Sequence, residues 1–155
     1  MQLAATLNRF SAHIAALTPT WLIGLVMRIA LFQVFWTAAQ TKISGSKIFG
    51  QKWQFWNVTD SAILLFEYEY NLPLIPPTIA AYAGTLAEFF LALGILFGVM
   101  TRFSALGLLI VTLVIQFLVN FNDWPVHILW AGPLLYLLKH GPGTLSVDAA
   151  LGRRG

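Results

Sequence analysis

The sequence predicts an all-α protein: a transmembrane four-helix bundle with an amphipathic N-terminal helix and a long aromatic-rich loop between helices 1 and 2. Of its 155 residues, 58% are hydrophobic and 10% charged, and the mean hydropathy is +0.75. A soluble domain has about 25% charged residues. Apolar runs also recur at lengths that suit a bilayer, separated by turn residues. We therefore expect one membrane domain over residues 1–155.

Residues 1–20 are expected to form a helix that lies in the membrane interface. Their apolar side chains recur at spacings of three and four, which places them on one helical face. This face comprises Leu3, Leu7, Phe10, Ile14 and Leu17. The first crossing follows at about residues 21–41. Lys42 comes next, with a stem long enough to reach the headgroups.

Residues 43–77 form a long connection that contains amphipathic aromatic residues, which suit the membrane–water boundary. Residues 60–70 within it are predicted to form a helix lying flat on the membrane. Three prolines at 73, 76 and 77 then start the second crossing afresh, at about residues 78–100. As a helix this run would be about 34 Å long, enough to cross a hydrocarbon core of about 30 Å.

The third and fourth crossings are separated by a turn signal at residues 122–125 (NDWP). We place the third crossing at about residues 103–121 and the fourth at about 125–139. The fourth apolar run is short, and Pro133 predicts a kink in it. Residues 140–155 are expected to form a cytoplasmic tail.

Lysine and arginine counts predict the orientation. The side that holds both termini carries five cationic residues, and the other side carries three. Because loops rich in lysine and arginine stay in the cytoplasm, we expect both termini there. The five are Arg9, Arg102, Lys139, Arg153 and Arg154, and the three are Lys42, Lys47 and Lys52.

Glu88 is the single formal charge in the second apolar run. An unpaired carboxylate at that depth costs several kcal/mol, so Glu88 needs a partner. Arg28 lies roughly 12 Å from the cytoplasmic end of the first crossing, and Glu88 roughly 18 Å from the same end of the second. An arginine side chain can bridge the remaining offset of about 6 Å. We therefore predict an intramembrane ion pair between Arg28 and Glu88.

Polar residues in the outer half of each crossing predict a hydrophilic pocket that opens to the outside. Residues of this kind also serve as simple hydrogen-bond partners between helices, and a buried ion pair can act as a packing device, so both interpretations remain open. His127 also suits a capped interfacial position. The pocket candidates are Gln33, Thr37 and Gln40 in the first crossing, Tyr82, Thr85 and Glu88 in the second, Thr112, Gln116 and Asn120 in the third, and His127 in the fourth.

The composition also excludes several kinds of chemistry. The chain has no cysteine, which removes thiol catalysis and thiolate metal ligands. Its three histidines are scattered, so we predict neither a metal site nor haem. No basic run with interleaved aromatic residues indicates nucleic-acid binding. Whether the chain takes part in an enzyme stays open, but catalysis by this chain alone is not favoured.

Several short motifs stand out along the chain: residues 70–77 (YNLPLIPP), 80–82 (AAY), 87–88 (AE), 98–102 (GVMTR), 114–116 (VIQ), 124–127 (WPVH) and 141–148 (GPGTLSVD). Together they resemble the DoxX family of bacterial inner-membrane proteins. The resemblance implies a multi-pass four-helix protein of the bacterial inner membrane. It also implies a link to quinone-coupled redox complexes, through the related thiosulfate:quinone oxidoreductase membrane subunit. Arg28, Lys42, Glu88, Arg102 and His127 fall on recurrent polar positions of that family.

Two functional hypotheses follow. In the first, the protein is a redox-associated subunit that binds a quinone or a similar amphipathic molecule in the outer pocket, and another protein supplies the electrons. In the second, it is a non-enzymatic scaffold for a membrane complex. Both imply contact with lipids and a partner protein. Gly94 and Gly98, four residues apart, permit a close helix contact within the chain or in a homo-oligomer.

Overall fold

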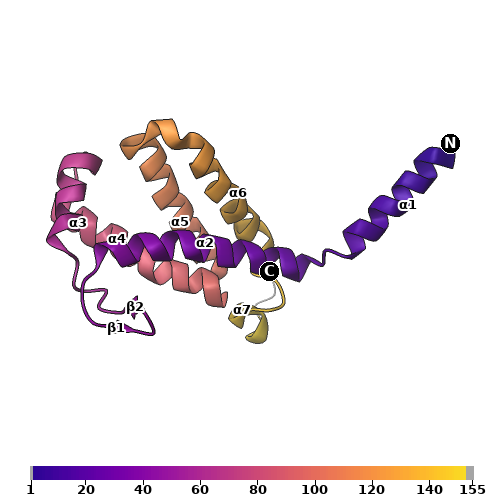
Figure 1. Ribbon diagram of the computed structural model, residues 1–155, viewed down its shortest axis with the longest axis horizontal. Coiled ribbons are helices and arrows are strands. Elements are labelled where there is room, and N and C mark those ends of the chain that lie inside the picture. Colours follow the sequence, from indigo (N-terminus) through magenta and orange to yellow (C-terminus); the bar gives the residue numbers. More distant parts are fainter. Residues whose placement is uncertain (1, 153–155) are drawn as a thin grey trace.

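The computed structural model describes residues 2–152 and is mostly helical (Figure 1). Helix α1 (Gln2–Ala16) extends away from the other helices. Its apolar side chains Leu7, Phe10 and Ile14 are exposed, which suits a helix in a membrane interface. Pro19, with an extended backbone, precedes α2 (Thr20–Lys42).

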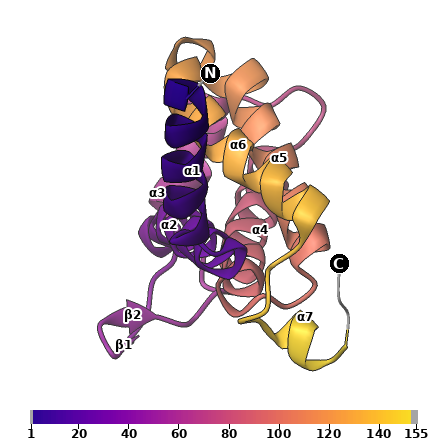
Figure 2. The same cartoon turned by 90° about the vertical axis from the view of Figure 1, so that its right-hand side faces the viewer.

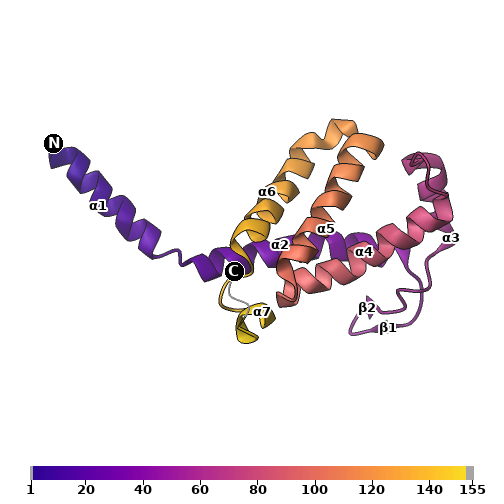
Figure 3. The same ribbon diagram turned by 180° about the vertical axis from the view of Figure 1, so that it is seen from behind.

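Within residues 2–152, four helices form the body of the protein. Helix α2 packs against α4 (Pro77–Phe97), α4 packs against α5 (Thr101–Val114), and α5 packs against α6 (Trp124–His140). Figures 1 and 3 show α5 and α6 side by side, crossing the α2–α4 pair at an angle. Buried apolar residues hold these helices together, among them Leu31, Phe35, Phe89, Ala92, Ile95, Leu108, Leu134 and Leu137.

Three of the described helices are long and apolar enough to cross a membrane: Thr20–Lys42, Pro77–Phe97 and Thr101–Val119. Helix α6 is shorter, with 17 residues and Pro133 inside it. The helix ends differ from the predicted crossings by one to three residues. Many large apolar side chains point outwards, for example Ile29, Phe90 and Ile110, which suits a surface that faces lipid.

The third long helix changes its winding before it ends. Helix α5 continues as a π-helical segment, η2 (Ile115–Val119), which the Asn120 N–H closes by donating to the carbonyl of Ile115 at 2.8 Å. A 3₁₀ turn, η3 (Phe121–Asp123), then leads into α6. A π turn contains more residues than an α turn, so side chains four apart no longer share one face.

The long connection contains a small β-hairpin that was not predicted. Strands β1 (Lys47–Ile48) and β2 (Gln51–Lys52) pair antiparallel and lie beside the end of α2. Gln51 Oε1 accepts a hydrogen bond from Trp36 Nε1 at 2.7 Å, which ties the hairpin to α2. The predicted helix at 60–70 is present as α3 (Asp60–Leu64) and the π-helical η1 (Leu65–Tyr70).

The C-terminal tail is attached to the turn between α4 and α5 (Figure 2). Helix α7 (Val147–Ala150) follows the GPGTLSVD motif. Its Asp148 carboxylate accepts hydrogen bonds from the Met100 and Thr101 N–H groups at 3.0 and 2.8 Å, at the start of α5. The Asp148 N–H in turn donates to the Gly98 carbonyl at 2.9 Å. Arg153 and Arg154, which entered the orientation count, lie outside the described residues.

Gly94 of α4 and Gly98 at its C-cap make contacts within the chain. A Cβ at Gly94 would meet the side chain of Ser104 on α5, and a Cβ at Gly98 would meet the side chains of Ser146 and Arg28. Gly98 also ends α4 in a left-handed conformation, with φ of 66°, which favours glycine. The close contacts that this glycine pair permits are therefore made within one chain, with α5 at Gly94 and with α2 and the tail at Gly98.

Candidate functional site

Glu88 is paired with Lys42 and not with Arg28. The Lys42 ammonium donates to both carboxylate oxygens of Glu88, with Nζ 2.7 Å from Oε1 and 2.6 Å from Oε2. The two residues are 5% and 4% exposed. The predicted pair between Arg28 and Glu88 is therefore wrong. The prediction that Lys42 reaches towards the headgroups is also wrong, because its amine is buried.

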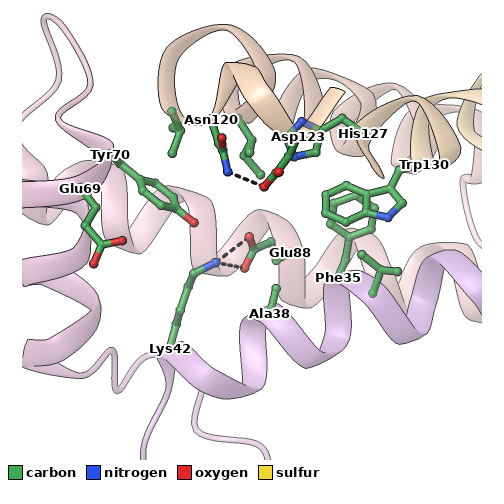
Figure 4. A pocket seen from close by; sticks show the side chains of 13 residues that line it. Phe35, Ala38, Lys42, Glu69, Tyr70, Glu88, Asn120, Asp123, His127 and Trp130 are labelled. Carbon is green, nitrogen blue, oxygen red and sulfur yellow. Dashed lines mark hydrogen bonds and ion pairs between the residues drawn. The ribbon is translucent and has the colours of Figure 1, made fainter. Parts of the chain in front are cut away.

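The register of α2 against α4 explains both errors. Arg28 lies level with the C-terminal end of α4, where its guanidinium donates to the carbonyl of Leu96 at 3.2 Å and to the carbonyl of Leu145. Carbonyls at a helix end lack intrahelical donors and carry partial negative charge, so they attract a cation. Lys42 is the last residue of α2, about 21 Å further along the helix axis. From there its side chain rises to Glu88 (Figure 4).

The ion pair lines a cavity of about 470 Å³ between the α2–α4 pair and the turn that joins η2 to α6. Residues at the end of η1 complete it. Its lining combines apolar and aromatic side chains with carboxylates, an amide and an imidazole. The lining comprises Val34, Phe35, Ala38, Lys42, Glu69, Tyr70, Glu88, Ile115, Val119, Asn120, Asp123, His127 and Trp130.

His127 enters this cavity from the first turn of α6 and is 6% exposed. Its Nδ1 lies 2.7 Å from Oε1 of Gln116, a residue of η2. Its ring lies against Trp130, with the ring centroids 5.1 Å apart. The imidazole is thus held on two sides, by a hydrogen bond and by an aromatic face.

Tyr70 and Asn120 add polar groups at the mouth of the cavity. Asn120 donates to the Asp123 carboxylate across the η2–α6 turn. Burial, and after it the negative charges of Glu88 and Glu69, raise the pKa of the Tyr70 phenol above its usual value. The phenol therefore stays protonated at neutral pH and can donate a hydrogen bond into the cavity (Figure 4).

The charges in the lining disfavour an anionic ligand. The lining contains three carboxylates, those of Glu69, Glu88 and Asp123, and one lysine. That lysine, Lys42, is already paired with Glu88. A phosphate or carboxylate headgroup would therefore meet net negative charge. Among residues 2–152, no group of three or more His, Cys, Asp or Glu could hold a metal ion. The lining suits a neutral molecule with hydrogen-bonding groups.

Some of the predicted pocket residues lie elsewhere. Gln33 and Gln40 line a second cavity of about 500 Å³ beside the hairpin, together with Thr37. There Gln33 donates to Thr37 Oγ1 at 3.1 Å, and Gln40 exchanges hydrogen bonds with the backbone of Lys52 at 2.8 and 3.0 Å.

Three further predicted residues are also outside the Lys42–Glu88 cavity, among them Thr85, which is fully buried. Tyr82 is 37% exposed and does not line it. Thr112 is buried and donates to the carbonyl of Leu108 in its own helix at 2.8 Å. Of the predicted set, the structure therefore brings together Lys42, Glu88, Asn120 and His127, with Gln116 behind His127.

Other residues of the cavity were not predicted, namely Tyr70, Glu69, Asp123 and Trp130. Tyr70 and Glu69 were assigned to a loop at the membrane boundary, and Asp123 to a turn. One signal for Asp123 was present in the sequence: Asp123 follows Asn120 by three residues, just before a helix that begins with a proline. The contact of η1 with η2 has no local signal in the sequence.

The apolar outward-facing helices and the buried polar cavity between them define a multi-pass integral membrane protein. Residues 23–121 match the DoxX family. The chain belongs to this family, which confirms the resemblance inferred from its motifs. Neither the curated proteins nor the solved structures gave a match to the chain.

Proposed function

We propose that the protein is a redox-associated membrane subunit that binds a quinone or a similar amphipathic small molecule in the Lys42–Glu88 cavity. The supporting observation is that a buried, doubly hydrogen-bonded ion pair lines an open space of about 470 Å³. An ion pair that served packing alone would need no space beside it. Cavities that take small molecules measure about 300–1,000 Å³ and combine apolar walls with a few polar groups.

An adjoining apolar cavity supports an amphipathic ligand. It measures about 230 Å³ and shares Tyr70, Glu88 and Ile115 with the polar cavity. The small residues Ala83, Gly84 and Ala87 of α4 give it room; the rest of its lining is Phe66, Leu72, Ile75, Ala80, Ile110, Val111 and Val114. A polar ring in the larger cavity could therefore continue into an apolar chain in the smaller one.

A redox role requires a partner protein. The chain contains no cysteine, so its own side chains cannot carry thiol chemistry or a thiolate-bound cluster. In this proposal the chain holds the ring, and a second protein exchanges electrons with it.

The same proposal places α6 as a fourth crossing in the bacterial inner membrane, with both termini in the cytoplasm. With 17 residues, α6 would be about 25 Å long, close to the thickness of a hydrocarbon core. Arg102 and the tail then lie on the cytoplasmic side, where the Arg102 guanidinium donates to the carbonyl of Lys139 at 3.2 Å. Lys42 and the cavity lie in the outer half.

The exposed hairpin favours a second candidate function, that of a membrane scaffold. Phe49 at the hairpin tip is 98% exposed, and Ile48 and Trp56 are 56% and 60% exposed. Such a cluster suits contact with another protein or with lipid. Under this alternative, Phe49→Ser should release a partner from a purified complex, and no small molecule should be found in the cavity.

Mass spectrometry of organic extracts from gently purified protein tests the proposal. Ala38→Phe places a ring inside the cavity and leaves Lys42 and Glu88 themselves unchanged, and Leu113→Phe adds the same ring on the lipid-facing side of α5, where Leu113 is 44% exposed. The proposal predicts a stoichiometric quinone in the wild type and in Leu113→Phe, and its loss in Ala38→Phe. No quinone in a well-folded wild type, or equal amounts in all three, would contradict it.

A further inference from the structure

The side-chain amide of Gln116 is held in one orientation. Its Nε2 donates to the backbone carbonyl of Phe121 at 2.9 Å, and its Oε1 lies 2.7 Å from Nδ1 of His127. A carbonyl accepts hydrogen bonds and cannot donate them, so the nitrogen of the amide must face Phe121. The oxygen must then face His127.

This orientation fixes the tautomer of His127. Because Gln116 Oε1 is an acceptor, Nδ1 of His127 must carry the proton. In a neutral imidazole the other nitrogen, Nε2, is then an unprotonated acceptor. Among the described residues, no side chain or backbone N–H donates to Nε2. His127 is 6% exposed and lines the cavity, so a ligand there is the natural donor.

The ion pair and the Tyr70 phenol do not discriminate in this way. Lys42 and Glu88 together offer an ammonium donor and carboxylate acceptors, so that end of the cavity suits either a carbonyl or a hydroxyl. The Tyr70 hydroxyl can donate or accept. Unlike the ion pair and the phenol, the imidazole presents, by its fixed tautomer, an acceptor alone.

We propose that His127 makes the cavity selective for ligands that present a hydroxyl or N–H donor to Nε2. For a quinone-type ring this means the hydroquinone, whose hydroxyl can donate, over the quinone, whose carbonyl oxygen would face the nitrogen lone pair. Gln116 is the positioning residue, because it holds the tautomer. This inference rests on the proposed function and names the redox form of the ligand that the cavity binds more tightly.

The test measures the affinity of purified full-length protein for a decyl-substituted benzoquinone and for its hydroquinone, under anaerobic conditions. The hydroquinone gains one hydrogen bond to Nε2, whereas the quinone places a carbonyl oxygen against the nitrogen lone pair. We therefore expect the hydroquinone to bind about tenfold more tightly. Gln116→Leu frees the imidazole to change tautomer, so the preference should fall towards one while the hydroquinone still binds. Gln33→Leu removes a comparable amide from the second cavity and should leave the preference intact.

Each outcome separates this inference from the proposed function. Equal affinities in the wild type, or a preference that survives in Gln116→Leu, would overturn the assignment of Nε2 and leave the quinone site standing. Binding of neither form to the wild type would overturn both. His127→Phe, which keeps an aromatic ring against Trp130, provides a second variant, in which the preference should also disappear.

Discussion

Two double-mutant cycles should distinguish Lys42 from Arg28 as the partner of Glu88. Lys42 and Glu88 are both more than nine-tenths buried, and among the described residues Glu88 accepts hydrogen bonds from Lys42 alone. Removing one member of a buried pair leaves the other charge uncompensated, at about 3–5 kcal/mol of the free energy of unfolding. Lys42→Met should cost more than Glu88→Gln, because the amide oxygen of glutamine can still accept from the ammonium.

Removing both members should cost less than the sum of the two single variants. We expect a coupling free energy of roughly 1–3 kcal/mol for Lys42→Met with Glu88→Gln. The free-energy changes of Arg28→Met and Glu88→Gln should be additive within about 0.5 kcal/mol, because Arg28 donates its hydrogen bonds to the carbonyls of Leu96 and Leu145 and not to Glu88. The assay is reversible unfolding in mixed micelles, followed by circular dichroism.

The reverse pattern would refute this pairing. If Arg28 and Glu88 couple strongly while Lys42 and Glu88 are additive, the register of α2 against α4 described above is wrong. Additivity in both cycles would mean that Glu88 is solvated and that the ion pair contributes nothing to the free energy of unfolding.

Three further predictions concern the tail, Tyr70 and the orientation. Asp148→Ala removes hydrogen bonds at the start of α5 and should lower the unfolding free energy by about 1–2 kcal/mol and expose the tail to protease; an unchanged cleavage rate would contradict this. The raised pKa of Tyr70 means that the folded state favours the neutral phenol. This contribution to the free energy of unfolding is complete below pH ~10 and is lost as the pH rises through the folded-state pKa. Absorbance titration should show a late-ionising component that Tyr70→Phe lacks. Since the chain has no cysteine, Phe49→Cys and Gly155→Cys can be labelled singly in intact cells; an impermeant thiol reagent should label the first and not the second.

The apolar runs, and the proline and glycine residues at their ends, predicted the helices well, because both are local properties of the sequence. Each long apolar run became a helix, and Pro77 and Gly98 flank one of them as their backbone preferences require. The relative offset of neighbouring helices along the bundle was less predictable. The pairing of Glu88 depends on how far α4 slides along α2, and a chain of hydrophobic contacts sets that offset without leaving a sequence pattern.

Departures from regular geometry account for the other differences. The prediction that Thr112, Gln116 and Asn120, each four residues apart, all line the pocket assumed a constant helical period, and the π-helical η2 breaks that period. The hairpin turn consists of Phe49 and Gly50, both with positive φ, where asparagine or aspartate before the glycine would have given a recognisable signal.

Photolabelling tests most directly whether the Lys42–Glu88 cavity binds a quinone-type ring. A photoreactive azidoquinone would be bound to the purified protein, irradiated, and its attachment sites mapped by mass spectrometry of peptides. We predict label within residues 69–70 or 115–130, which border the cavity, and its loss in Ala38→Phe but not in Leu113→Phe. Label confined to Gln33, Gln51 and Trp53 of the second cavity, or to α1, would contradict the proposed site.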